Sequence, residues 1–96
     1  MKNCICSAKR KVAKKLANNL IHSILWDKDW EIEGYNTVSF IKRGNVEIRL
    51  IPGPFHIREI LDVYHNGNKL WFPILQRIRI RCAVRLRLLW EAEKSI

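Results

Sequence analysis

The sequence predicts a small α+β domain in which an antiparallel sheet lies between two amphipathic helices. Apolar residues recur at helical spacing through the first 28 residues. Alternating apolar and polar residues, separated by turn residues, occupy the middle of the chain. The stretch Pro73–Lys94 then holds no Gly or Asn and is rich in helix-forming residues. These patterns favour a β-meander of four to five strands with an N-terminal and a C-terminal amphipathic helix, in one domain that spans residues 1–96.

The charge of the chain is concentrated at its two ends. The chain has 96 residues and a net charge of +9, and its hydrophobic content of 48% excludes general disorder. Residues 1–30 and residues 67–96 each carry seven Lys or Arg against two Asp or Glu, whereas residues 31–66 carry four against five. Such a field favours an anionic partner, which can be nucleic acid, an acidic protein surface or an anionic membrane.

The first helix is expected to begin after a loose tail of residues 1–6. Ser7 is a suitable N-cap, and the helix should run to about Lys28. One half of the helical wheel is apolar and comprises Val12, Ala13, Leu16, Ala17, Leu20, Ile21 and Ile24. The other half is basic and rich in amides, with Lys11, Lys14, Lys15, Asn18, Asn19 and His22. This pattern is typical of an amphipathic helix with a basic outer face.

The middle of the chain is expected to form hairpins. A short strand start near Trp30–Gly34 precedes alternating segments at residues 35–42 and 45–51, and Pro52-Gly53-Pro54 ends the second of them. A further strand is expected from about Arg58 to Tyr64, with a return strand at residues 69–72. The turn between these two, His65-Asn66-Gly67-Asn68, is typical of a type I′ hairpin.

The stretch Pro73–Lys94 allows two interpretations. At period 2, Ile78, Ile80, Cys82 and further apolar residues share one face and the arginines share the other, as in a strand. At period 3.6, an apolar seam forms from Leu75, Ile78, Cys82, Leu86 and Leu89. The opening proline, the helix-forming residues and the length of about 20 residues favour the helix.

The helical interpretation leaves a second apolar row roughly opposite the seam. This row comprises Ile80, Val84 and Leu88. A helix that is apolar on two sides either lies inside the domain or contacts another chain. The row is therefore a candidate partner interface, for a homodimer or for a different protein.

The sequence contains no recognisable catalytic or metal-binding motif. Phosphate-binding glycine loops, nucleophile elbows and Cys-x-x-Cys pairs are all missing, and the three histidines have no metal spacing. We therefore expect a protein that is not an enzyme and uses no metal and no cofactor. No run of apolar residues is long enough for a transmembrane segment, and the odd count of three cysteines predicts a reducing, cytoplasmic location.

The basic helix faces give the leading functional hypothesis, which is nucleic-acid binding. Phosphate contacts need several Lys or Arg side chains about one helical turn apart on one face. The residues that satisfy this spacing are Lys11, Lys14 and Lys15 in the first helix and Arg77, Arg81 and Arg85 in the last. The alternative is a protein-interaction or inhibitor module that uses the two-sided apolar C-terminal helix.

One short segment is similar to a known family. Gly53-Pro54-Phe55-His56 resembles the Gly-Pro-x-His loop of double-stranded RNA-binding domains, which also order a helix, an antiparallel sheet and a basic final helix. The chain departs from that pattern by an extra strand pair. It also has Gln76-Arg77-Ile78-Arg79 where the family has Lys-Lys-x-Ala-Lys. Four residues and an order of elements do not assign the chain to this family.

Overall fold

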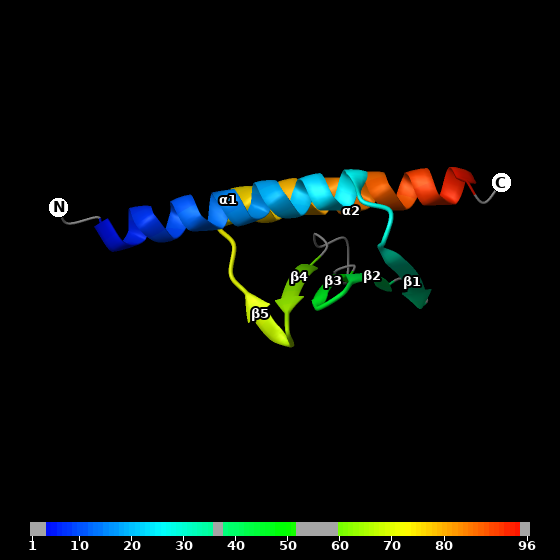
Figure 1. Ribbon diagram of the computed structural model, residues 1–96, viewed down its shortest axis with the longest axis horizontal. Helices are drawn as coiled ribbons and strands as arrows, with labels where there is room; N and C mark the ends of the chain where they lie inside the picture. Colours follow the sequence, from blue (N-terminus) through cyan, green and yellow to red (C-terminus); the bar gives the residue numbers. More distant parts are fainter. Residues whose placement is uncertain (1–3, 36–37, 52–59, 95–96) are drawn as a thin grey trace. The chain divides into compact units, whose positions relative to one another are not determined.

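The fold is α+β, as the sequence predicts: in chain order it comprises a helix, a five-stranded antiparallel sheet and a second helix. The computed structural model describes residues 4–35, 38–51 and 60–94. The elements in chain order are α1 (Cys4–Trp26), β1 (Glu31–Tyr35), β2 (Val38–Arg43), β3 (Val46–Ile51), β4 (Ile60–His65), β5 (Asn68–Leu70) and α2 (Ile74–Lys94) (Figure 1). The segment 53–56, which resembles a family loop, lies outside the described residues.

The chain divides into two compact units. The helical unit comprises residues 1–27 and 71–96 and contains α1 and α2. The sheet unit comprises residues 28–70 and contains the five strands. The prediction of one domain over residues 1–96 stays a prediction, and each unit is described separately below.

The sheet unit is an antiparallel meander with strand order β1-β2-β3-β4-β5. One cross-strand row joins Ile41 of β2 to Ile48 of β3, and Ile48 to Val63 of β4. These three side chains are buried, as are Leu50 and Leu61 on the same face. Strict alternation therefore selects the buried face, because successive side chains of a strand point to opposite sides.

The turn at Asn66-Gly67 has the backbone that its sequence predicts. Both residues have positive φ angles, 54° and 81°, as a type I′ hairpin requires. The Asn66 backbone N–H also donates to the carbonyl oxygen of Asn45 in the neighbouring turn, at 2.9 Å. The two hairpin turns at this end of the sheet are thereby tied together.

Helix α1 is longer at its start than expected. It begins at Cys4, so residues 4–6 belong to the helix and not to a loose tail, and Ser7 lies inside the helix instead of capping it. Its end at Trp26 lies two residues before the expected end. The Asp27 backbone N–H donates to the Ser23 carbonyl, and the Ser23 hydroxyl donates to the Asp27 carboxylate at 2.7 Å, which closes the last turn.

Helix α2 confirms the helical interpretation of the C-terminal stretch, and it runs parallel to α1. The hydrogen bonds between the two helices join residues separated by 60, 61 and 63 positions, an almost constant offset. An antiparallel pair would show a steadily changing separation. Figure 1 shows both helices progressing through the chain colours in the same direction. A short connection would have made neighbouring helices antiparallel, so the intervening strands serve as the crossover that allows the parallel pair.

The buried face of α2 is opposite to the expected one. Its buried residues are Gln76, Ile80, Ala83, Val84 and Arg87. The predicted core seam is largely exposed: Leu75, Leu86 and Leu89 are 62%, 39% and 61% accessible, and Cys82 is exposed too. The expectation that the seam packs inside was wrong. Ala13 and Ala17 give α1 a buried face of small residues, and Ile80 and Val84 are the bulky branched residues buried on α2.

Candidate functional site

The net positive charge belongs entirely to the helical unit. Residues 1–27 and 71–96 contain twelve Lys or Arg and three Asp or Glu, whereas residues 28–70 contain six of each. The helical unit therefore carries the whole net charge of +9, and the sheet unit is neutral. A surface that attracts anions is expected on the helices.

A lysine-rich cluster lies in the first half of α1. Lys9, Arg10, Lys11, Lys14 and Lys15, here called the α1 basic cluster, are all exposed. No acidic residue occurs anywhere in Cys4–Trp26, so none neutralises this cluster from within the helix. Lys11 and Lys15 are one turn apart on the same face, and both point away from the buried Ala13–Ala17 face.

The parallel arrangement brings the start of α2 beside this cluster. The Lys9 ammonium lies 4.9 Å from the ring centroid of Trp71, which precedes α2 by three residues. Neither helix has an acidic residue in its first turn. Each helix N-terminus carries about half a unit of positive charge from its aligned peptide dipoles, which adds to the charge of the lysines. This end of the helical unit is therefore its most electropositive part.

The arginine row of α2 faces a different direction from the lysines. Arg79 donates from Nη2 to the side-chain oxygen of Asn18 in α1, at 2.8 Å, so its flank of α2 faces α1. Arg77 and Arg81, two residues before and after Arg79, point to the other flank because two residues turn a helix by about 200°. Arg77 and Arg85 are exposed and Arg81 is half-buried. The structure thus keeps the predicted arginine row together, but it does not join the row to the lysines.

Arg87 is buried and joins the two helices, so it is not part of the basic surface. It is 6% exposed, and its Nη1 donates to the carbonyl oxygens of Ile24 and Asp27, both at 2.7 Å. Its Nε donates to the Glu91 carboxylate at 3.0 Å. The carbonyls at the C-terminal end of α1 have no helical partner and attract a cation, which explains why this arginine is buried.

A shallow hollow lies beside the α1 basic cluster. It measures about 400 Å³ and is lined by Lys9, Val12, Ala13, Leu16 and Trp71. Val12, Leu16 and Trp71 remain 58%, 47% and 55% exposed. Sequence reasoning missed this site because Trp71 and Lys9 are far apart in the chain. The only available signal was an aromatic residue close to the start of a basic helix.

The predicted partner row and the exposed apolar row are different sets of residues. Ile80 and Val84 are 0% and 1% exposed, and Leu88 is half-buried, so most of this row packs against other residues of the same chain. The exposed apolar residues of α2 are instead Ile74, Leu75, Leu86 and Leu89. Near the other helix end, Trp26 is 65% exposed, and its ring lies 6.4 Å from that of Trp90.

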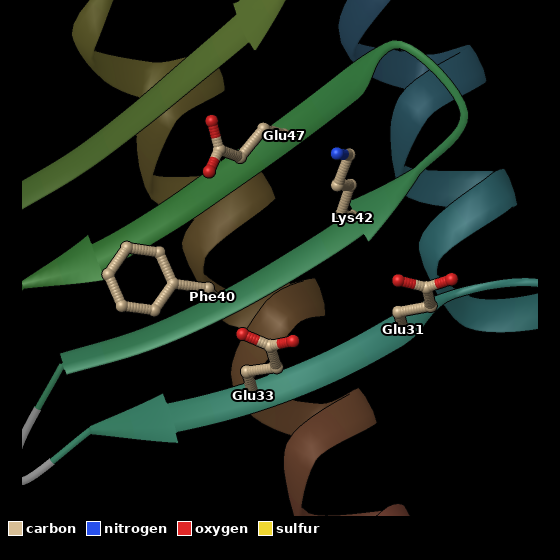
Figure 2. Close-up of a pocket in the computed structure, with 5 residues that line it drawn as sticks. All are labelled: Glu31, Glu33, Phe40, Lys42 and Glu47. Atoms are coloured by element: carbon tan, nitrogen blue, oxygen red, sulfur yellow. The ribbon is translucent and has the colours of Figure 1, made fainter.

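A second pocket lies on the sheet unit. It measures about 340 Å³, and Figure 2 shows Glu31, Glu33, Phe40, Lys42 and Glu47 projecting from the same face of β1, β2 and β3. The register sets Lys42 between Glu31 and Glu47. Opposite charges on neighbouring strands stabilise a sheet by about 0.2–1 kcal/mol per pair, so this arrangement has a structural explanation.

An arginine between two aromatic rings covers the middle of the same sheet face. The Arg49 guanidinium carbon lies 4.7 Å from the Tyr64 ring centroid and 5.9 Å from that of Phe40. Its Nη2 also donates to Glu47 at 3.2 Å. Beside it, Lys69 pairs with Asp62 at 3.2 Å. Arg49 and Lys69 on this face thus each have a carboxylate partner at 3.2 Å, whereas α1 contains no acidic residue that could pair with the α1 basic cluster.

Among the residues that the structure describes, no three His, Cys, Asp or Glu side chains gather as a metal site would require. Within the same part of the chain, neither helix is long and apolar enough to cross a bilayer. Comparisons of this chain with protein-family models, with curated proteins and with solved structures give no match. The assignment of a function therefore rests on the geometry and charge of the helical unit.

Proposed function

We propose that this protein binds nucleic acid, and that the α1 basic cluster makes the first contact with the phosphate backbone. The observation that carries the proposal is five exposed cations within seven residues, Lys9–Lys15, on a helix without any acidic residue. The proposed activity is binding without catalysis, metal or cofactor. The exposed Cys82 thiol suits the reducing cytoplasmic location expected from the sequence.

The α1 basic cluster lowers the stability of the free protein, and this destabilisation supports the view that the cluster has a binding function. Like charges one turn apart, such as Lys11 and Lys15, cost about 0.2–0.5 kcal/mol per pair. A polyanion relieves this repulsion, and the release of its counterions drives binding.

The two basic rows have separate roles in this proposal. Lys11, Lys14 and Lys15 lie on the outer side of α1, whereas Arg77, Arg81 and Arg85 follow the flank of α2 that points away from α1. The lysines form the primary contact. The arginines extend the positive field around the helical unit and increase the rate of encounter with a polyanion.

A salt-dependent binding measurement with matched charge variants tests the proposal. Fluorescence anisotropy of a labelled duplex and a labelled single strand is followed from about 50 mM salt upwards. The double variant Lys11→Glu and Lys15→Glu should lose at least about tenfold in affinity. The slope of log affinity against log salt should fall by about 1.4–1.8, because each lost phosphate contact contributes 0.7–0.9.

The matched control is the double variant Lys28→Glu and Lys94→Glu. These two lysines are exposed and lie near the C-terminal ends of α1 and α2. The control changes the net charge by the same amount, and it should keep the wild-type slope. A wild-type protein that binds neither probe at low salt contradicts the proposal. An equal loss in the control variant would mean that overall charge, and not the α1 basic cluster, determines binding.

The exposed apolar residues of α2 support protein-partner binding as a second candidate. Leu75 and Leu89 are more than half exposed and share one helix face with Leu86. Leucines in such a row are costly to leave in water, at about 25 cal/mol per Å² of apolar surface. The site proposed for a partner is therefore this row, in place of Ile80, Val84 and Leu88.

A further inference from the structure

We infer that the hollow beside Trp71 holds an unpaired base, so that the nucleic acid bound by this protein is single-stranded. The inference rests on the proposed function and names its substrate class. It adds a base-stacking site to a surface that the sequence describes only by its charge.

The hollow combines the three chemical features that a nucleotide requires. Its aromatic wall is the exposed Trp71 ring, and its aliphatic wall comprises Val12 and Leu16. Its cation is Lys9, whose ammonium lies 4.9 Å from the Trp71 ring centroid. The volume of about 400 Å³ falls within the usual range for small-ligand sites of about 300–1,000 Å³.

Each feature matches one part of a nucleotide. A base has two apolar π faces and stacks on an aromatic side chain whatever its identity. The backbone phosphate next to it needs a cation within a few ångströms. A base on the free face of Trp71 leaves Lys9 in place, and a base on the other face displaces the ammonium toward the phosphate. Both positions pair the aromatic ring with the base and Lys9 with the phosphate.

The α1 basic cluster provides a path for the strand beyond the hollow. Lys15 lies about 60° around the helix from Val12, and Lys11 follows about 40° further in the same direction. A strand that leaves the hollow over Val12 therefore crosses Lys15 and then Lys11, both of which are exposed. Single-strand binding sites combine such a positively charged path for the backbone with aromatic side chains on which bases stack.

The single strand is favoured over a duplex because of the geometry of base pairs. Inside a duplex both faces of each base are covered by stacking, so an exposed indole has no base face to contact there. Only an unpaired base can enter an open hollow on a helix surface. Trp26 provides an internal comparison, since it is similarly exposed on the same unit but its ring lies against that of Trp90.

The test compares Trp71→Ala, Trp71→Phe and the control Trp26→Ala. The probes are fluorescein-labelled oligothymidine and a duplex, each of about 20 nucleotides per strand, measured by anisotropy at one salt concentration. Trp71→Ala should weaken binding to oligothymidine by about 5- to 150-fold, the loss expected for one base–aromatic stack of about 1–3 kcal/mol. Binding to the duplex should be unchanged. Trp71→Phe should retain most of the affinity, and Trp26→Ala should match the wild type.

The outcomes separate this inference from the proposed function. Binding by the wild type with no effect of Trp71→Ala, or an equal loss with Trp26→Ala, overturns the stacking site and leaves the lysine contacts standing. No binding of either probe by the wild type refutes both proposals. Binding to phosphatidylglycerol vesicles is measured as a third probe. If Trp71→Ala reduces binding to these vesicles and not to oligothymidine, the hollow is a lipid contact and the inference is wrong.

Discussion

Replacement of Arg87 by methionine should destabilise the protein more than any change to a surface arginine. Arg87 is buried at 6% exposure, and it donates hydrogen bonds to the carbonyls of Ile24 and Asp27 and to the Glu91 carboxylate. Methionine keeps much of the side-chain volume and removes all three bonds. The carbonyl groups at the end of α1 then lose their cation, and Glu91 loses its nearest partner.

The expected cost follows from these contacts. Hydrogen bonds that involve a charged group contribute about 1.5–3 kcal/mol each, and removal of one partner from a buried ionic network typically costs about 3–5 kcal/mol in total. The whole free energy of unfolding of a chain of this length is about 5–14 kcal/mol. Arg87→Met should therefore lower Tm by at least about 12 °C, since 1 kcal/mol corresponds to roughly 4–8 °C in a domain of this size.

The control is Arg85→Met, the same substitution at an exposed position of the same helix. It should change the free energy of unfolding by no more than about 1 kcal/mol. Both variants are unfolded in urea and followed by tryptophan fluorescence and circular dichroism. If Arg87→Met costs no more than Arg85→Met, the carbonyls of α1 do not depend on Arg87. The parallel register of the two helices would then also be in question.

Two further comparisons test the faces and the turn. Ile80→Asp places a charge at a fully buried position and should abolish the cooperative unfolding transition, whereas Leu89→Asp, 61% exposed, should change stability by less than about 0.5 kcal/mol. If the exposed leucine row mediates self-association, sedimentation should give a wild-type mass above the monomer mass of 11.4 kDa. The mass of Leu89→Asp should then equal that of the monomer. A monomeric wild type would show that the row does not mediate self-association. Gly67→Ala should lower the free energy of unfolding by about 1–2 kcal/mol, because residue 67 has a φ of 81°. Gly34→Ala should leave stability nearly unchanged, since the new Cβ would lie 3.8 Å from the nearest atom outside its chain neighbours. Equal urea midpoints for the two glycine variants would show that the turn does not need glycine.

Strands β3 and β4 were predictable because each has one buried and one open face. In β3, for example, Ile48 and Leu50 alternate with Arg49, and the buried residues are those that alternation selects. The Asn66-Gly67 turn was predictable for a different reason, since few other residue pairs tolerate two positive φ angles. The signals in both cases are local and need no knowledge of the rest of the chain.

The candidate site was predictable in its charge and not in its shape. The exposed lysines of α1 lie where the helical period puts them, because their charge keeps them in water. The hollow beside Trp71 depends on a contact between residues 9 and 71, and no local pattern encodes that contact. The start of α1 was missed because Cys4–Cys6 carry no capping signal, and the chain nevertheless continues the helix through them.

The sequence by itself determined which segments are helices and strands, and that the helices carry the charge. The direction of α2 relative to α1, and with it the choice between the two apolar rows of α2, was decided only in the tertiary structure. Both rows are hydrophobic enough to be buried, so hydrophobicity alone does not distinguish them. The parallel register of the two helices decides which row is buried, because it places Arg87 next to the carbonyls at the end of α1. Ile80 and Val84 lie on the same face of α2 as Arg87, so they are buried with it. The leucines of the other row then remain exposed.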